Sequence, residues 1–263
     1  FVTDNAIKPF LQQIQGKNFK LTSLAGSLTW IATPVLDNNG QMKGVAMSKL
    51  PYTAFVEKSE NAWNFADGLE QRYGVEGIGT RENQVFQKIN GIGNNEEILF
   101  FQAIDEMMGH QYANVQQRVQ STGIILDKEF NYLRDEWRTA SKDSNKIKTF
   151  GNKGEYKTDT AGVIDYKYNA YGVAYVHEDE TIKLGNSSGW YAGAVHNRFK
   201  FKDIGGSKEN QTMLKLGVFK TMSPAKDHNG SLQWTISGEG YVSRNDMHRK
   251  YLVVDDIFNA KSD

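Results

Sequence analysis

The sequence predicts an α+β chain built in several parts, with a β-hairpin first, helices in the middle and antiparallel strands at the end. Residues 231–243 indicate the strands most clearly, because apolar and polar side chains alternate there with period two, as in a strand between an apolar and an aqueous medium. Several earlier segments repeat this alternation, whereas residues 53–143 place apolar side chains at helical spacing. Such strands, rich in Tyr and Trp and separated by polar turns, are typical of an up-and-down transmembrane β-barrel.

Composition limits the functions open to the chain. It has 263 residues with 31 basic and 31 acidic side chains, so no net charge draws it to nucleic acid or to anionic lipid. No stretch approaches the ~20 apolar residues that a membrane-spanning helix needs. This criterion does not apply to the strands of a β-barrel, because half of the residues in each strand can face water. The absence of Cys excludes disulfides and thiolate metal sites. The chain opens at Phe1 without the features of a secretory signal, so we expect a removed signal or a longer parent protein.

The N-terminal part is predicted to hold a short helix and a hairpin. The helix spans Ile7–Ile14, and Gly16 can end it. Residues 19–50 then alternate on both sides of the turn Asp37–Gly40, which predicts two paired strands. Residues 63–73 return to helical spacing and predict the first helix of the middle part.

Two further helices are predicted from their caps. Thr80 can cap the start of one helix, and Gly91 can close it. The next is predicted to begin at Asn94, with Glu97 completing a capping box, and to end before Gly109.

The longest predicted helix runs from about Gln111 to Arg138. Residues 116–121 make it polar on most sides, so it is either poorly packed or enclosed by wet surroundings. Its apolar stripe supplies the predicted packing residues Leu126, Phe130, Leu133 and Trp137.

From about residue 146 the period changes to two. Strands are predicted to be centred near residues 150, 171, 195, 216 and 237, with a sixth at 247–257. Trp190 and Trp234 belong either to an interfacial girdle or to a core. Four lysines are expected to line a pore mouth or face solvent: Lys146, Lys148, Lys153 and Lys157. Lys-bearing faces beside apolar ones also fit one sheet of a soluble sandwich, and the alternation leaves that alternative open.

The order of these segments resembles the C-terminal region of bacterial autotransporters (type V secretion). In residues 98–114, an apolar helical turn and a small-residue break precede a Tyr-Ala-Asn helix start. The stretch Ile164–Val176, with its core Tyr171-Gly172-Val173-Ala174, is similar to the second barrel strand, and Leu184–Asn197 to the third. The predicted hairpin at residues 19–50, which ends in the sequence Met47–Tyr52, resembles the last rungs of a secreted passenger.

The resemblance implies three parts: the end of the passenger at 1–72, a helical linker with a lumenal helix at 73–145, and the N-terminal strands of the barrel at 146–263. The junction before the lumenal helix would consist of Gly109, His110, Tyr112, Ala113 and Asn114. Barrels of the family have about twelve strands, whereas this chain has room for roughly six, so we expect an incomplete barrel.

The function implied is outer-membrane anchoring and export. The barrel would lie in the outer membrane of a Gram-negative type envelope, in contact with its lipid, and would display an adhesin-like passenger on the cell surface. Barrel-assembly machinery would assist, and the passenger would contact an unknown host or bacterial ligand. Enzymatic activity, a cofactor, a metal and nucleic-acid binding are not expected. The alternatives are a soluble or surface-exposed binding module of an adhesin, and the C-terminal part of a surface serine protease whose catalytic domain lies upstream.

Three motifs suggest sharper chemistry. Gly185–Gly189 matches the G-x-S-x-G pattern, but a strand is predicted after it where a helix is required, so a polar hairpin loop is favoured. Asn94-Asn95 resembles the self-cleavage pair of some autotransporters but lies before the junction, and helix capping is favoured. The five His residues lack the i, i+4 spacing of metal ligands on a helix.

Overall fold

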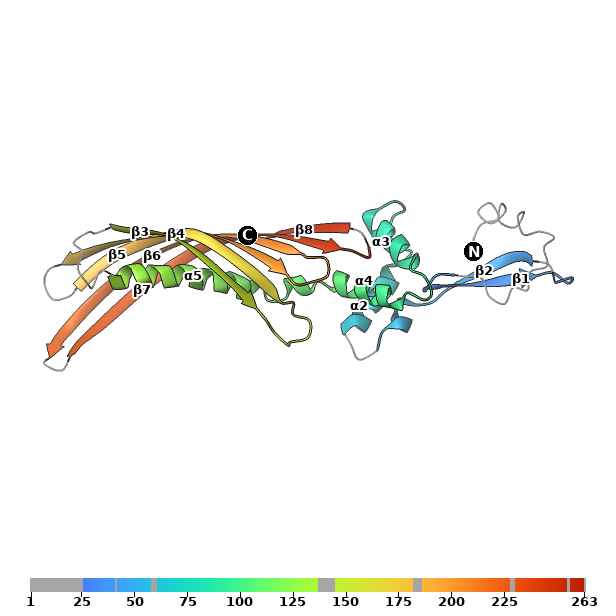
Figure 1. The fold of residues 1–263 in the computed structure, drawn as a ribbon, viewed down its shortest axis with the longest axis horizontal. Helices are drawn as coiled ribbons and strands as arrows, with labels where there is room; N and C mark the ends of the chain where they lie inside the picture. Colours follow the sequence, from blue (N-terminus) through green and yellow to red (C-terminus); the bar gives the residue numbers. More distant parts are fainter. Residues whose placement is uncertain are drawn as a thin grey trace. The chain divides into compact units, whose positions relative to one another are not determined.

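The computed structural model describes residues 26–40, 42–57, 61–136, 145–181, 186–227, 230–254 and 256–262. The chain divides into two compact units, Phe1–Gly109 with Tyr251–Asp256, and His110–Lys250 with Ile257–Asp263. A mostly antiparallel sheet and several helices confirm the predicted α+β class (Figure 1). The predicted helix at Ile7–Ile14 lies outside the described residues. No helix in the described ranges is long and apolar enough to cross a membrane.

The first unit contains the predicted hairpin. Strands β1 (Trp30–Leu36) and β2 (Met42–Lys49) pair antiparallel. The amide of Gly40 donates to the carbonyl of Asp37 over 3.0 Å, and Gly40 adopts a φ of 73°, which glycine accommodates without strain. The predicted turn at Asp37–Gly40 is therefore confirmed.

Four short helices follow the hairpin. They are η1 (Tyr52–Phe55), α2 (Asn61–Arg72), α3 (Arg81–Asn90) and α4 (Glu97–Met108). Thr80 caps α3 as predicted, since its side chain accepts a hydrogen bond from the amide of Asn83, and Gly91 ends the helix.

The predicted capping box at Asn94 is wrong. Helix α4 begins at Glu97, and its N-cap is Glu96, which makes no side-chain cap hydrogen bond. The Glu96 carboxylate instead accepts from the amide of Gly93 over 2.9 Å. The Glu96 side chain is therefore bonded to the turn before the helix and does not cap the first amides of α4.

Tyr52 lies at the centre of the first unit and is fully buried. Its ring centroid lies 6.0 to 6.2 Å from those of three neighbours, Tyr73, Phe86 and Phe100. The Tyr52 hydroxyl donates to the Asn90 side-chain oxygen over 2.9 Å. Burial raises the pKa of Tyr52 well above its ordinary value, because the ionised phenolate would lose its solvation.

An ion pair connects the hairpin to these helices. The ammonium of Lys49, the last residue of β2, lies 2.6 Å from a Glu70 carboxylate oxygen and 3.9 Å from the centroid of the Tyr52 ring. The same Glu70 oxygen accepts from the backbone amide of Tyr52 over 2.9 Å. This charge-assisted contact therefore links the end of β2 to α2.

The second unit is built on an antiparallel six-stranded sheet with the order β3-β4-β5-β6-β7-β8, so that every strand lies beside its neighbour in sequence. The strands are β3 (Asn145–Tyr156), β4 (Tyr166–Thr181), β5 (Asn186–Phe201), β6 (Lys208–Asp227), β7 (Gly230–Tyr251) and β8 (Asp256–Ser262). Among the described strands β3 and β8 form the two edges, and the sheet is not closed into a barrel.

The first five strands cover the predicted centres, and the sixth differs from its prediction. Residues 247–257 were expected to form one strand, yet 247–251 end β7 and β8 begins only at Asp256. Leu252 and Val253 form the turn between them. Within the first unit, their amides both donate to the buried Glu106 carboxylate, over 3.1 and 3.3 Å.

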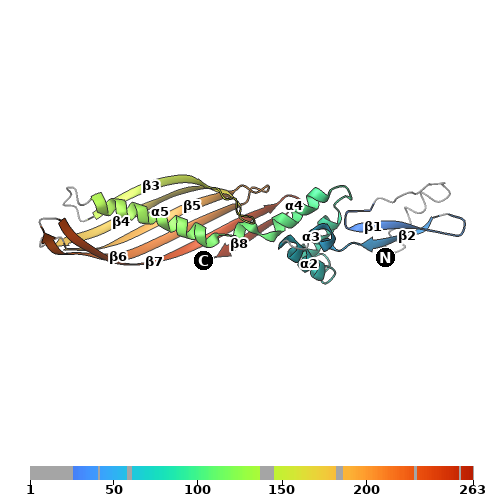
Figure 2. The same cartoon turned by 90° about the horizontal axis from the view of Figure 1, so that it is seen from below.

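Helix α5 (Val115–Glu136) lies along one face of this sheet (Figures 1 and 2). We call the face that α5 contacts the inner face and the opposite one the outer face. The 22-residue helix agrees with most of the predicted span 111–138, although His110–Tyr112 form a separate 3-10 turn.

Candidate functional site: the interface of helix α5 with the inner face

The inner face of the sheet is identified by alternate burial along β6. From Glu209 to Thr221 every second residue of this strand is buried, and these residues include four polar ones: Glu209, Gln211, Lys215 and Thr221. The intervening Leu214, Leu216 and Val218 are 53 to 65% exposed. The strand therefore buries polar side chains toward the helix and exposes aliphatic ones on the outer face.

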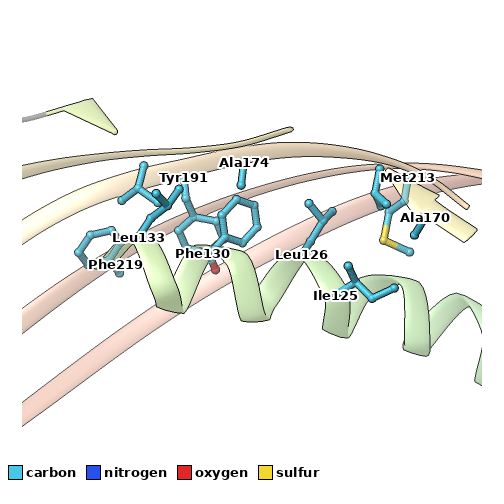
Figure 3. Packing of buried hydrophobic residues seen from close by; sticks show 11 residues of the cluster. Ile125, Leu126, Phe130, Leu133, Ala170, Ala174, Tyr191, Met213 and Phe219 are labelled. Carbon is cyan, nitrogen blue, oxygen red and sulfur yellow. The ribbon is translucent and has the colours of Figure 1, made fainter. Parts of the chain in front are cut away.

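The apolar part of the interface gathers the predicted packing residues. Leu126, Phe130 and Leu133 are at most 3% exposed. They form one cluster with side chains from β4, β5 and β6, including Ala170, Ala174, Val176, Tyr191, Val195, Met213 and Phe219 (Figure 3). The structure thus brings together three of the four predicted residues, and Trp137 lies outside the described residues.

Gly193 lets the helix approach β5 closely. A Cβ atom at this position would lie 2.7 Å from Cζ of Phe130 and 2.8 Å from Cδ2 of Leu126. Both distances are shorter than van der Waals contact, so a larger residue would force these two side chains or α5 itself to shift.

Arg118 of α5 makes a buried polar contact with the sheet. Its guanidinium forms an ion pair with Glu209 of β6, and both side chains are 1% exposed. The same guanidinium donates to the carbonyls of Ala113 and Gln111 over 2.9 and 2.8 Å and lies 4.8 Å from the Phe201 ring centroid. The planar guanidinium thus binds both the sheet, through Glu209, and the turn that precedes α5.

One turn further along the helix, Thr122 continues this polar contact. Its hydroxyl donates to the Gln211 side-chain oxygen over 2.7 Å and accepts from the Asn197 amide over 3.0 Å. All three side chains are buried. Buried polar groups are costly unless they are hydrogen-bonded, so this set stabilises one position of α5 against β5 and β6.

Two acidic residues of α5 pair with lysines of the inner face. The Lys215 ammonium lies 2.5 Å from Asp127 and 2.8 Å from Glu239, and its side chain is 4% exposed. The Tyr191 hydroxyl donates to Glu239 over 2.8 Å. Nearer the end of the helix, Lys148 lies 2.7 Å from Glu129. Charges of both signs on the helix therefore have partners on the sheet.

The predicted junction residues form the turn that precedes α5. Gly109 ends α4 in the left-handed conformation, with φ 80° and ψ 35°. His110 and Tyr112 bound the 3-10 turn. Asn114 has a φ of 61°, a value rare for a residue other than glycine, and its carbonyl accepts the first helical hydrogen bond, from Arg118. The Ala113 carbonyl, as noted, also accepts from Arg118.

The outer face carries an apolar band between polar ends. Three successive cross-strand rows over β3 to β7 consist mainly of apolar or small residues: Thr149-Val173-Ala194-Leu214-Val242, Ile147-Tyr175-Ala192-Leu216-Gly240 and Asn145-His177-Trp190-Val218-Gly238. Trp190 and Trp234 are 44% and 58% exposed on this face, so neither is a core aromatic.

The other motifs of the sequence occupy structural positions. Ser187, the central serine of the G-x-S-x-G match, lies within β5 and pairs with Glu180 and Thr221 on the neighbouring strands, which is not a strand-turn-helix elbow. Asn94-Asn95 lie in the turn before α4. In the described part of the chain, no group of three potential metal ligands comes together.

Sequence reasoning missed the polar half of the interface. Arg118 was recognised only as part of a polar helix surface, and Glu209 and Gln211 were not singled out. Their signal was present: Glu209, Gln211 and Lys215 share the parity opposite to Leu214 and Leu216. The alternation alone did not indicate whether the odd- or the even-numbered residues of the strand face the helix.

Comparisons of the chain with protein-family models, with curated proteins and with solved structures found no match.

Proposed function

We propose that this chain is the translocator region of an autotransporter, which anchors a passenger in the outer membrane and exports it. In this proposal the six strands are the N-terminal part of a transmembrane β-barrel, and α5 occupies its lumen. The observation that supports it best is the reversed polarity of β6, which carries Glu209 and Lys215 in buried ion pairs on the inner face and exposed aliphatic side chains on the outer face.

That reversal is the arrangement expected of a barrel wall in lipid. A soluble sheet places aliphatic residues toward its core and polar ones toward water. Here Leu214, Leu216 and Val218 are exposed beside Trp190 and Trp234, whereas Lys215 is buried. Outer-membrane strands alternate in this sense, with aromatic residues near the interfaces and polar groups toward the lumen.

Helix α5 would act as the plug. A helix that is polar on several sides is stable in a wet lumen only if its charges find partners there, and Arg118, Asp127 and Glu129 each pair with a strand residue. The chain would then leave the lumen through the junction at residues 109–114.

The hairpin fits the end of a passenger. A two-stranded hairpin is marginally stable alone, and Ile31, Val35 and Leu36 of β1 are 45 to 53% exposed. Stacking of a preceding rung on this surface would bury those side chains. The remaining proposed partners are outer-membrane lipid, barrel-assembly machinery and a host or bacterial ligand of the passenger.

The test exploits the exposure of Leu216. In water, Leu216→Arg should change stability by no more than about 0.5 kcal/mol, because the side chain is 65% exposed. In a bilayer, a central lipid-facing arginine costs roughly 2–4 kcal/mol, whereas one near the interface costs about 0–1 kcal/mol. Ser188→Arg, on a polar row of the outer face, is the matched control.

The measurement is flotation of the full chain with phosphatidylcholine vesicles after dilution from detergent. We expect the wild type and Ser188→Arg to float and Leu216→Arg to remain largely unbound. A wild-type chain that stays monodisperse without detergent and ignores vesicles would contradict the membrane proposal and favour the soluble binding module.

A further inference from the structure

Three lysines lie directly opposite one another on the outer face, across three neighbouring strands. Lys167 of β4 pairs in register with Lys200 of β5, and Lys200 pairs with Lys208 of β6. His248 of β7 continues the same line opposite Lys208. We call Lys167, Lys200 and Lys208 the cation row. Strands are about 4.8 Å apart, so the line from Lys167 to His248 spans roughly 14 Å.

This arrangement is unfavourable in the protein alone. Like charges directly opposite one another destabilise a strand pair, and here two successive pairs carry them. All three lysines are exposed. The carboxylate nearest in register is Glu155, opposite Lys167 at the β3 end, and it is engaged with Lys202 and Lys157. Within the described part of the chain, neither Lys200 nor Lys208 forms an ion pair.

Further cations extend the surface toward the apolar band. Arg198 is exposed two residues before Lys200, and Arg244 stands two rows nearer the band on β7. Asp246 is the acidic member of this region, and it lies 3.8 Å from Arg244. The cation row thus lies at one end of the outer face, three rows from Val173, Ala194 and Leu214, with the rows of Arg198 and Arg244 in between.

We propose that the cation row binds the phosphate groups of anionic lipid headgroups whose acyl chains lie on the apolar band. The inference rests on the proposed membrane function. Phosphate supplies the negative charge that faces neither Lys200 nor Lys208, and the aliphatic rows, which begin three rows further along the outer face, supply the contact for the chains of the same lipid. A nucleic acid would satisfy the lysines but not the exposed apolar rows, so a lipid fits both features.

The test uses the full chain and vesicles of two compositions, phosphatidylcholine alone and an equimolar mixture with phosphatidylglycerol. Lys200→Gln/Lys208→Gln removes two charges from the row. Lys43→Gln/Lys128→Gln removes two exposed charges elsewhere and is the matched control. Circular dichroism checks that each variant keeps its β-sheet, which surface substitutions should leave intact.

We expect the wild type and the control to prefer the anionic vesicles, and the double variant to lose roughly 30-fold of its partition coefficient for them at low salt. Its binding to phosphatidylcholine should not change. Equal binding of the wild type to both compositions would overturn the lipid site while leaving membrane insertion intact. Failure of the wild type to bind either would instead overturn the proposed function. Tighter binding to a single-stranded oligonucleotide than to anionic vesicles would overturn the choice of lipid.

Discussion

The ion pair between Arg118 and Glu209 allows the docking of α5 to be tested quantitatively. Removing one partner of a fully buried pair leaves an uncompensated charge and costs about 3–5 kcal/mol. Because both side chains are 1% exposed, solvent cannot compensate either one. Arg118→Met would also leave the carbonyls of Ala113 and Gln111 without their donor. We therefore expect the full penalty to fall on the docked state of the helix.

Replacing both partners should behave differently. Apolar residues of similar volume often substitute for a buried pair without loss, so Arg118→Met/Glu209→Leu should recover most of the lost stability. Lys148→Met is the control, since it breaks the pair with Glu129 where the lysine side chain is 35% exposed. A partly exposed pair contributes about 0–1 kcal/mol.

The assay is amide hydrogen exchange along α5 in detergent micelles. The expected result for Arg118→Met is exchange faster by more than ~100-fold, with Lys148→Met changing it less than about 6-fold and the double variant close to wild type. Two results would refute the assignment of this pair as the main polar contact of the helix. One is an increase in exchange rate below about 3-fold for Arg118→Met, and the other is a double variant that exchanges as fast as the single one.

Two further predictions concern packing and pH. Gly193→Ala should destabilise the second unit by about 1–3 kcal/mol through overlap with Phe130 and Leu126, whereas Gly240→Ala, which meets no atom within 4 Å, should be nearly neutral. Denaturant titration measures both, and equal effects would argue against close approach of α5 at Gly193. For the first unit, the raised pKa of Tyr52 means that the stabilisation by its neutral form is complete below about pH 10 and is lost as pH rises through the folded-state pKa. Tyr52→Phe should weaken this alkaline loss in thermal melts followed by circular dichroism, and an unchanged alkaline dependence would contradict the attribution to Tyr52.

Local signals predicted the elements well wherever one short-range interaction decides them. The turn at Asp37–Gly40 needs a positive φ at Gly40, and the cap at Thr80 needs only a hydroxyl three residues before an amide. The start of α4 was placed at Asn94 because Asn94 and Glu97 have the spacing of a capping box. Glu96 serves the turn at Gly93, and the helix begins after it. The start of the helix is thus decided by the turn geometry, which spacing alone does not contain.

The boundary between β7 and β8 depended on a contact distant in sequence. Residues 247–257 alternate well enough to suggest one strand. The amides of Leu252 and Val253 instead turn toward the Glu106 carboxylate, which lies about 150 residues earlier in the chain. A period-two pattern carries no information about such an acceptor, so the strand was predicted across the turn.

The two faces of each strand were separated correctly by parity, yet parity does not say which face is buried. On β4 and β5 the apolar set containing Ala170, Ala174 and Val195 lies under the helix, whereas on β6 the apolar set containing Leu214 and Leu216 is exposed. The helix accounts for this difference. Its apolar residues, Leu126, Phe130 and Leu133, need small and aliphatic partners, while Arg118, Thr122 and Asp127 need polar ones.

The inner face is therefore defined by complementarity to α5 and not by hydrophobicity. A purely apolar inner face would bury Arg118 without a partner, and a purely polar one would leave Phe130 without contacts. Polar strand residues lie opposite polar residues of the helix, and apolar strand residues lie opposite apolar ones. The polarity of the inner face therefore changes along the helix, from the Arg118–Glu209 pair to the cluster around Leu126 and Phe130. A register shift of the helix by one turn would break both kinds of contact together. Buried ion pairs add little net stability, so we expect the Arg118–Glu209 pair to select one register of the helix against the sheet.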